Sequence, residues 1–82
     1  MRVVLVEDHH LVRKGLRLLL EEEGHQVVAE FARAEEALAH AWEAEVVLLD
    51  LNLPGMGGLE ALPQLAKRAK VLVVSMHDEP AY

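Results

Sequence analysis

Cysteine is absent from the 82 residues of this sequence, so disulfide bonds and thiolate metal sites are excluded. A chain without disulfides is typical of the cytoplasm. Aromatic residues make up only 4% of the chain. No apolar run approaches the roughly 18 residues that a membrane-spanning helix needs, and the first run, 2–6, meets acidic residues at once, unlike a secretory signal. These absences predict a cytoplasmic protein that does not associate with a membrane.

Positive charge is also scarce, because eight lysines and arginines are set against 14 acidic residues and the net charge is −6. This balance disfavours binding to nucleic acid or to an anionic membrane, so we expect no direct nucleic-acid binding by this chain. Apolar residues, in contrast, make up 52% of the sequence. That fraction can fill one small core, and the length predicts a single domain over 1–82.

The apolar residues alternate between short continuous runs and helical spacing. Strands are predicted at 2–6, 26–31, 46–49 and 71–75. Helices are predicted between them, at 11–23, 34–42 and 59–69, the last with a late start or a bend at Pro63. Strands and helices in strict alternation predict an α/β fold, with a mostly parallel sheet and helices on both of its faces.

Three of the predicted strands end in polar side chains. Glu7 and Asp8 follow the first strand, Asp50 follows the third, and Ser75 ends the fourth. In parallel α/β sheets, ligands bind beyond the carboxyl ends of the strands, so these groups converge if the three strands are neighbours. Carboxylates this close repel one another unless a cation lies among them, and an all-oxygen ligand set favours Mg²⁺. Asp50 would then be a nucleophile that accepts a phosphoryl group; the alternative is four separate strand-end groups in water.

Three segments carry a resemblance to a known family: "VVLVEDHHLVRKGLRLLLEEEG", "VVLLDLNLPGMGGLEAL" and "VLVVSMHDEPAY". Their order and spacing are similar to the receiver domain of two-component response regulators, in particular receivers whose output is a helix-turn-helix DNA-binding domain. The resemblance implies a flavodoxin-like parallel sheet with strand order 2-1-3-4. It also implies a signalling domain rather than an enzyme, one that accepts a phosphoryl group from a sensor histidine kinase and controls transcription.

The resemblance implies a role for each polar residue at the strand ends. Asp50 matches the phosphoacceptor, and Ser75 matches the hydroxyl residue that contacts the phosphoryl group and moves on activation. Glu7 and Asp8 match the acidic pair that holds Mg²⁺, together with Asp50 and the backbone carbonyl of Asn52. Asn52 also argues against a third interpretation, a small phosphatase, because such enzymes typically carry a second acid at that position.

The sequence departs from the family in two places. Gly57 stands where the family frequently has an aspartate, so we expect a looser start to the third helix. The family's fifth strand, with its lysine, and its fifth helix have no counterpart, which implies an incomplete receiver domain over 1–82. Lys67 and Lys70 cannot replace that lysine, because they precede the fourth strand at the far end of the sheet. A working phosphoacceptor and a non-catalytic remnant that serves as an interaction module both remain open.

Two apolar surfaces predict self-association. The fourth strand would be an exposed apolar edge, which is a template for pairing with another chain. Leu16 and Leu20 widen the apolar arc of the first helix beyond what a sheet alone covers, whereas Arg13 and Arg17 fall on its polar side. We therefore expect a homodimer through the fourth-strand edge, the first helix, or both.

Histidine and tryptophan offer further candidates. His9, His10 and His77 could bind a transition metal together with Asp8. This interpretation is less favoured than a magnesium site, because the adjacent His9 and His10 cannot both point inward and histidines at a helix start are usually solvated. Trp42 lies on the apolar stripe of the second helix and is predicted to fill the core rather than to bind a ligand.

Overall fold

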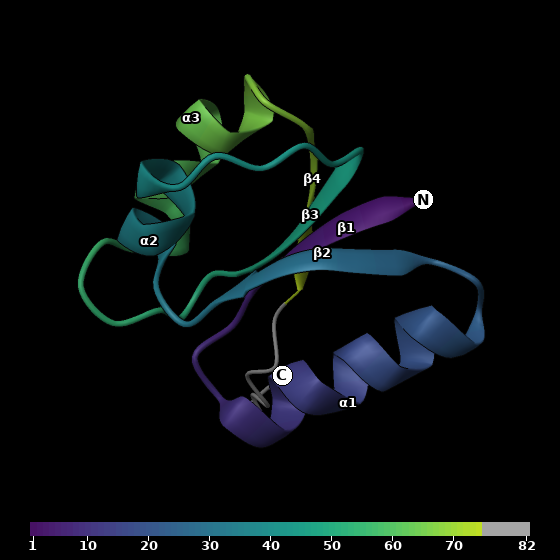
Figure 1. The fold of residues 1–82 in the computed structure, drawn as a ribbon. Helices are drawn as coiled ribbons and strands as arrows, with labels where there is room; N and C mark the ends of the chain where they lie inside the picture. Colours follow the sequence, from purple (N-terminus) through teal and green to yellow (C-terminus); the bar gives the residue numbers. More distant parts are fainter. Residues whose placement is uncertain (75–82) are drawn as a thin grey trace, which may run out of the picture.

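The structure, a computed structural model, describes residues 1–74, which form a parallel sheet with helices on both faces (Figure 1). The strands are β1 (Arg2–Val6), β2 (Gln26–Phe31), β3 (Val46–Asp50) and β4 (Lys70–Val74). The helices are α1 (His10–Glu22), α2 (Ala34–Ala39) and α3 (Gly58–Ala66). The predicted alternation of strands and helices is confirmed. Ser75 and His77 lie outside the described residues.

The sheet has the order β2-β1-β3-β4 and every described pair of strands is parallel, so the predicted order 2-1-3-4 is confirmed. The chain leaves β1 in one direction to form β2, and then crosses back to place β3 on the other side of β1. This reversal of strand order is where parallel α/β sheets bind ligands. Val6 of β1 pairs with Leu49 of β3, so the residues that follow, Glu7 and Asp50, emerge side by side.

One face of the sheet carries a dense apolar core beneath α2 and α3. Alternate residues of β1 and β3 point to this face and meet small or aliphatic side chains of the two helices. The buried members of this core are Val4, Val6, Ala34, Ala37, Val47, Leu49, Leu53, Ala61 and Leu65. Alanines at the helix contacts let the backbones approach the sheet closely, and each fully buried leucine contributes roughly 1.5–3 kcal/mol. Most of the stabilising burial therefore lies on this face.

The opposite face is covered by α1, which lies along β1 and β2 (Figure 1). No residue of α1 is buried, and Leu11 and Leu19 are 80% and 60% exposed. The prediction that Arg13 and Arg17 lie on the solvent side of this helix is wrong, because both guanidinium groups form ion pairs with Glu30 on β2, at 3.3 and 2.7 Å. Glu30, the only acid of β2, thus holds Arg13 and Arg17 of α1 against the sheet.

The second helix ends at Ala39, three residues earlier than predicted. The Ala37 carbonyl, which would accept the bond from residue 41 in a longer helix, accepts side-chain bonds from Trp42 Nε1 (2.9 Å) and Arg68 Nη1 (3.1 Å) instead. Arg68 also lies over the Trp42 ring, 3.9 Å from its centroid. Trp42 packs against the core as predicted, although from the loop that follows α2.

The third helix begins at Gly58, so the predicted late start caused by Pro63 is wrong. The bond that a proline removes would have reached the carbonyl of Leu59, and Leu59 is 72% exposed, so water can satisfy that carbonyl. Gly57, at the N-cap, offers no side chain, and the Glu60 carboxylate accepts a bond from its backbone N–H at 3.4 Å. Within residues 1–74, no helix is long and apolar enough to cross a membrane.

Candidate metal centre

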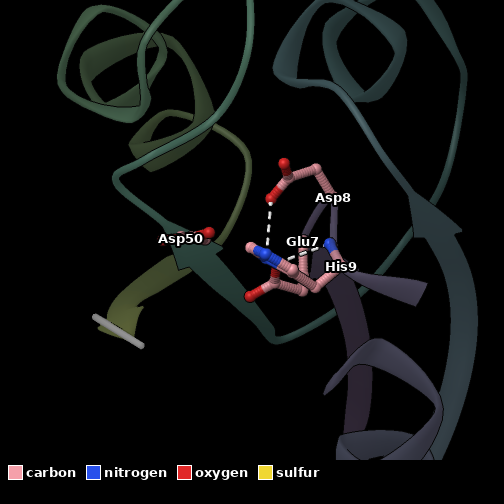
Figure 2. Close-up of side chains that lie close together, drawn as sticks. All are labelled: Glu7, Asp8, His9 and Asp50. Carbon is pink, nitrogen blue, oxygen red and sulfur yellow. Dashed lines mark hydrogen bonds and ion pairs between the residues drawn. The ribbon is translucent and has the colours of Figure 1, made fainter. Parts of the chain in front are cut away.

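Four side chains meet where β1 and β3 end: Glu7, Asp8, His9 and Asp50 (Figure 2). Each offers one ligand atom, and these four atoms lie within 4.8 Å of one another. The three acids come together as the strand topology predicts, since β1 supplies two of them and the neighbouring β3 supplies the third. The structure adds His9 to the group, one of the three histidines that the sequence offered, with Asp8, for a less favoured transition-metal site.

Two of these acids are almost completely removed from solvent. Glu7 is 2% exposed and Asp50 is 3% exposed. The Oδ1 atom of Asp50 accepts a bond from the Asn52 backbone N–H at 3.0 Å, and Glu7 Oε2 accepts one from the His9 backbone N–H at 2.8 Å. Glu7 Oε1 and Asp8 Oδ1 are also buried, yet neither accepts a hydrogen bond within residues 1–74. Buried acceptors without partners cost about 1–3 kcal/mol each, and more when charged, so this site is destabilised in the absence of a ligand.

The electrostatics of Glu7 reflect this crowding. Burial raises the pKa of the Glu7 carboxyl group, and the adjoining Asp8 carboxyl group and the negative charge of Asp50 act in the same direction. The bonds from His9 oppose the increase in pKa. A divalent cation among these oxygens would supply the missing charge and the missing partners together, and carboxylate oxygens are the ligands that Mg²⁺ prefers. The donor set of this site therefore fits a magnesium ion.

The loop after Asp50 is held close to β3 by glycine. A Cβ atom at Gly58 would lie 2.6 Å from the Asp50 carbonyl oxygen and 2.8 Å from Leu51 Cα, so a larger residue would push α3 away from the strand. Gly55 has a φ of +71°, which shapes the preceding turn. The sequence predicted a looser helix start at Gly57, whereas the close approach to the strand is made by Gly58.

Arg13 is a second residue whose place at the site was missed. Its Nη1 atom donates to the Glu7 backbone carbonyl at 2.6 Å, while its Nε atom pairs with Glu30. The side chain is only 17% exposed. Arg13 therefore links the backbone carbonyl of Glu7, directly after β1, to Glu30 of β2. It holds the backbone from which the Glu7 and Asp8 side chains extend. The single acid within the apolar run 26–31 was the available clue.

Residues 3–82 match the response regulator receiver domain. Response regulator UvrY from Escherichia coli K12 is 40% identical over 83 residues, which cover 94% of this chain and 38% of UvrY. Transcriptional regulatory protein UhpA from Salmonella typhimurium is 44% identical over 82 residues, covering 96% of this chain and 42% of UhpA. A crystal structure of response regulator protein TrrA from Thermotoga maritima, in complex with Mg(2+)-BeF, superposes with a TM-score of 0.84 at 29% identity, covering 94% of this chain and 70% of TrrA.

The chain belongs to the receiver-domain family of response regulators. Its fold is that of a receiver with four parallel strands and three helices within residues 1–74. The family is one of signalling domains rather than enzymes, and the acidic cluster lies at the carboxyl end of the sheet where the resemblance placed it. The chain spans about two fifths of the length of UvrY and UhpA, 38% and 42%.

Proposed function

We propose that this chain is a phosphoacceptor in which Asp50 receives a phosphoryl group from a phosphohistidine of a sensor histidine kinase. The observation that carries this proposal is the meeting of Glu7, Asp8 and Asp50, two of them buried, with oxygens of Glu7 and Asp8 that accept no hydrogen bond within residues 1–74. A strand-end acid without a functional partner would be expected to stay in water, because burying an unpaired charge is unfavourable. A cluster that is unfavourable when empty of cations favours a site that functions with one bound.

The residues divide the chemistry between them. The Asn52 N–H holds Oδ1 of Asp50, which leaves the second carboxylate oxygen to attack phosphorus. As the new O–P bond forms, the N–P bond to the donor imidazole breaks and its electron pair returns to the ring nitrogen. Glu7, Asp8, Asp50 and the Asn52 carbonyl would hold Mg²⁺, which supplies neutralisation of the charge on the phosphoryl oxygens. Ser75, outside the described residues, is proposed to contact the phosphoryl group afterwards.

The relatives favour a transcriptional output for the protein that carries this domain. UhpA is described as a transcriptional regulatory protein and UvrY as a response regulator. We propose that phosphorylation of Asp50 controls transcription through a part of the protein that binds DNA. The acidic chain itself, with its net charge of −6, is not that part.

Phosphorylation can be tested directly with acetyl phosphate and Mg²⁺. We expect intact-mass spectrometry to show one added phosphoryl group in the parent chain and none in Asp50→Asn. Glu45→Gln, an exposed acid at the other end of the sheet, is the matched control and should be labelled as the parent is. Absence of an adduct from the parent chain, or labelling of Asp50→Asn to the same extent, would rule the proposal out.

A second candidate function, self-association, rests on exposed apolar residues. In the described part of the chain β4 is an edge strand, and its Leu72 and Val73 are 51% and 46% exposed. Leu19 of α1 is 60% exposed. We propose a homodimer through the β4 edge, α1 or both, a role the chain could fill without phosphorylation.

Light scattering after size-exclusion chromatography tests this second candidate. We expect the mass of two chains for the parent and of one chain for Leu72→Lys. Leu59→Lys is the control, because Leu59 is more exposed, at 72%, but lies on α3, which belongs to neither proposed surface. A parent chain that remains a folded monomer at high concentration would exclude the dimer.

A further inference from the structure

We propose that the imidazole of His9 is a ligand in this centre, and that the site therefore binds a borderline divalent ion such as Zn²⁺ in addition to Mg²⁺. The inference rests on the metal centre of the proposed function, but it does not require that Asp50 accepts a phosphoryl group. Carboxylate oxygens suit Mg²⁺, whereas an imidazole nitrogen added to them shifts preference towards Zn²⁺ and its neighbours in the transition series.

The position of the ring carries the argument. His9 Nδ1 lies 3.2 Å from Glu7 Oε2 and 3.4 Å from Asp8 Oδ1, with Asp50 completing the group (Figure 2). Two ligands that share one zinc ion with tetrahedral bonds near 2.0–2.1 Å are separated by roughly 3.3–3.4 Å. The spacing of the nitrogen from both oxygens is therefore already close to that of a shared ion. Little movement of the backbone is required to admit one.

An independent observation points to a ligand at the same place. Glu7 Oε1 and Asp8 Oδ1 are buried and accept no hydrogen bond within residues 1–74, although the Glu7 side chain is only 3% exposed. His9 donates to Glu7 Oε2, and its Nδ1 atom also lies in ion-pair range of Asp8 Oδ1, at 3.4 Å. Glu7 Oε1 has no partner within residues 1–74. A hydrogen-bonded histidine alone thus does not complete the site. An ion that takes oxygens from both acids as well as the ring nitrogen does.

The neighbouring histidine provides a contrast. His10 is the first residue of α1, and its Nδ1 atom lies 3.4 Å from Arg13 Nη2, so its ring is engaged away from the acids. His9 is the N-cap of the same helix, with extended backbone angles, and its side chain is 69% exposed. The start of the helix at residue 10 therefore selects which of two adjacent imidazoles faces the carboxylates. The two positions form a matched pair for mutation.

Calorimetric titration of the parent, His9→Gln, His10→Gln and Asp50→Asn with Zn²⁺ and, separately, with Mg²⁺ tests the inference. Loss of groups that only orient a ligand weakens metal affinity by about 10–100-fold, so removal of the His9 ring should weaken Zn²⁺ binding at least about tenfold. Mg²⁺ affinity should change little in His9→Gln, because glutamine retains a polar side chain. His10→Gln should bind both ions as the parent does. Far-ultraviolet circular dichroism would confirm that each variant is folded.

The titrations report on the inference, and labelling by acetyl phosphate reports separately on the proposed function. Zn²⁺ binding by His9→Gln equal to the parent's, or an equal loss in His10→Gln, would overturn the role of His9. Zn²⁺ binding that depends on His9 in a chain that acetyl phosphate does not label would support the inference while removing the phosphoacceptor. Failure of the parent to bind either ion, with no difference in Asp50→Asn, would overturn the metal centre and the inference together.

Discussion

The two ends of the sheet use the same residue type in opposite ways. At the amino end, Glu45 is exposed and its Oε1 atom accepts a bond from the Arg2 backbone N–H at 2.9 Å. At the carboxyl end, Glu7 is 2% exposed and its Oε1 atom has no partner among the described residues. Exposed glutamates that remain hydrated lose little on folding, whereas a buried one is unfavourable until something charged joins it. The difference shows where the fold gives up stability, and that is where function is expected.

Other polar groups also find partners at the amino end of the sheet more fully than at the carboxyl end. At the amino end, Arg2 Nε donates to the Glu43 carbonyl at 3.1 Å, and the terminal amino group lies 3.1 Å from His25 Nδ1. At the carboxyl end, the close approaches of Gly58 and Arg13 hold the backbone around the acids instead of satisfying their oxygens. Rigid surroundings with unsatisfied carboxylates are the arrangement expected of a pre-formed cation site. Substitutions at the carboxyl end, each paired with a control elsewhere in the chain, test this difference between the two ends of the sheet.

The largest effect is expected from Gly58→Ala. Its Cβ atom would approach the Asp50 carbonyl oxygen to 2.6 Å, and overpacking of this kind costs typically about 1–3 kcal/mol. We expect a loss of that size in urea unfolding, together with weaker Mg²⁺ binding because α3 moves away from β3. Gly15→Ala in α1 is the control, since no atom of residues 1–74 lies within 4 Å of its added Cβ. That variant should be stabilised by roughly 0.5–1 kcal/mol.

Arg13→Met should destabilise the fold to a similar extent, without changing the position of α3. It removes a bond to the Glu7 carbonyl and an ion pair with Glu30 from a side chain that is 17% exposed. We expect a loss of about 1.5–3 kcal/mol, the range for hydrogen bonds that involve a charged group. Lys14→Met, on the exposed side of the same helix, should change the free energy of unfolding much less. Equal losses in the two variants would show that Arg13 does not hold the end of β1.

Glu7→Gln should change stability in opposite directions with and without metal. Without metal, the neutral amide removes a buried charge whose Oε1 atom has no partner within residues 1–74, so the variant should be more stable than the parent by on the order of 1 kcal/mol. With Mg²⁺ present the parent should gain stability and the variant should gain less. Glu45→Gln should fall within about 0.5 kcal/mol of the parent in both conditions, as surface substitutions usually do. A metal-free Glu7→Gln that is clearly less stable than the parent would contradict the account.

The pH dependence should be the smallest of these effects. Burial raises the pKa of Glu7 above its ordinary value of 4.5, so the folded state binds this proton more tightly than the unfolded state does. The contribution of Glu7 to the free energy of unfolding therefore falls as pH rises from that ordinary value through the raised pKa, and is constant outside this window. Urea unfolding of the metal-free parent and Glu7→Gln at a series of pH values measures this contribution of Glu7, because the variant lacks the titrating group. The difference between the two proteins should widen, in favour of the variant, as pH increases.

The strands could be predicted from the sequence because each is a short aliphatic run between polar segments. β1 and β2 have the predicted bounds, and β3 is longer by one residue, Asp50 itself. Helix ends were less predictable, because tertiary bonds decide them. Arg68, far along the chain, donates to the Ala37 carbonyl, which a longer α2 would have used, and to the His40 carbonyl just after the helix. Apolar spacing cannot report such competition.

The candidate site also contains residues that the sequence could predict and residues that it could not. Its acids were predictable, since strand order and the rule for strand ends place Glu7, Asp8 and Asp50 together. His9 was not, because its direction depends on which residue opens α1 and two adjacent histidines offer the same pattern. Arg13 was assigned to the solvent side because helical spacing alone contains no information about Glu30 on the neighbouring strand.

The central claim is that the buried acids at the carboxyl end form a cation site built around Asp50. The most direct measurement is the gain in free energy of unfolding when Mg²⁺ is added to the parent, Asp50→Asn and Glu45→Gln. At a free Mg²⁺ concentration one hundred times Kd, the parent and Glu45→Gln should each gain about 2.7 kcal/mol. Asp50→Asn should gain far less at the same concentration. No gain in the parent, or the same gain in Asp50→Asn, would contradict the account.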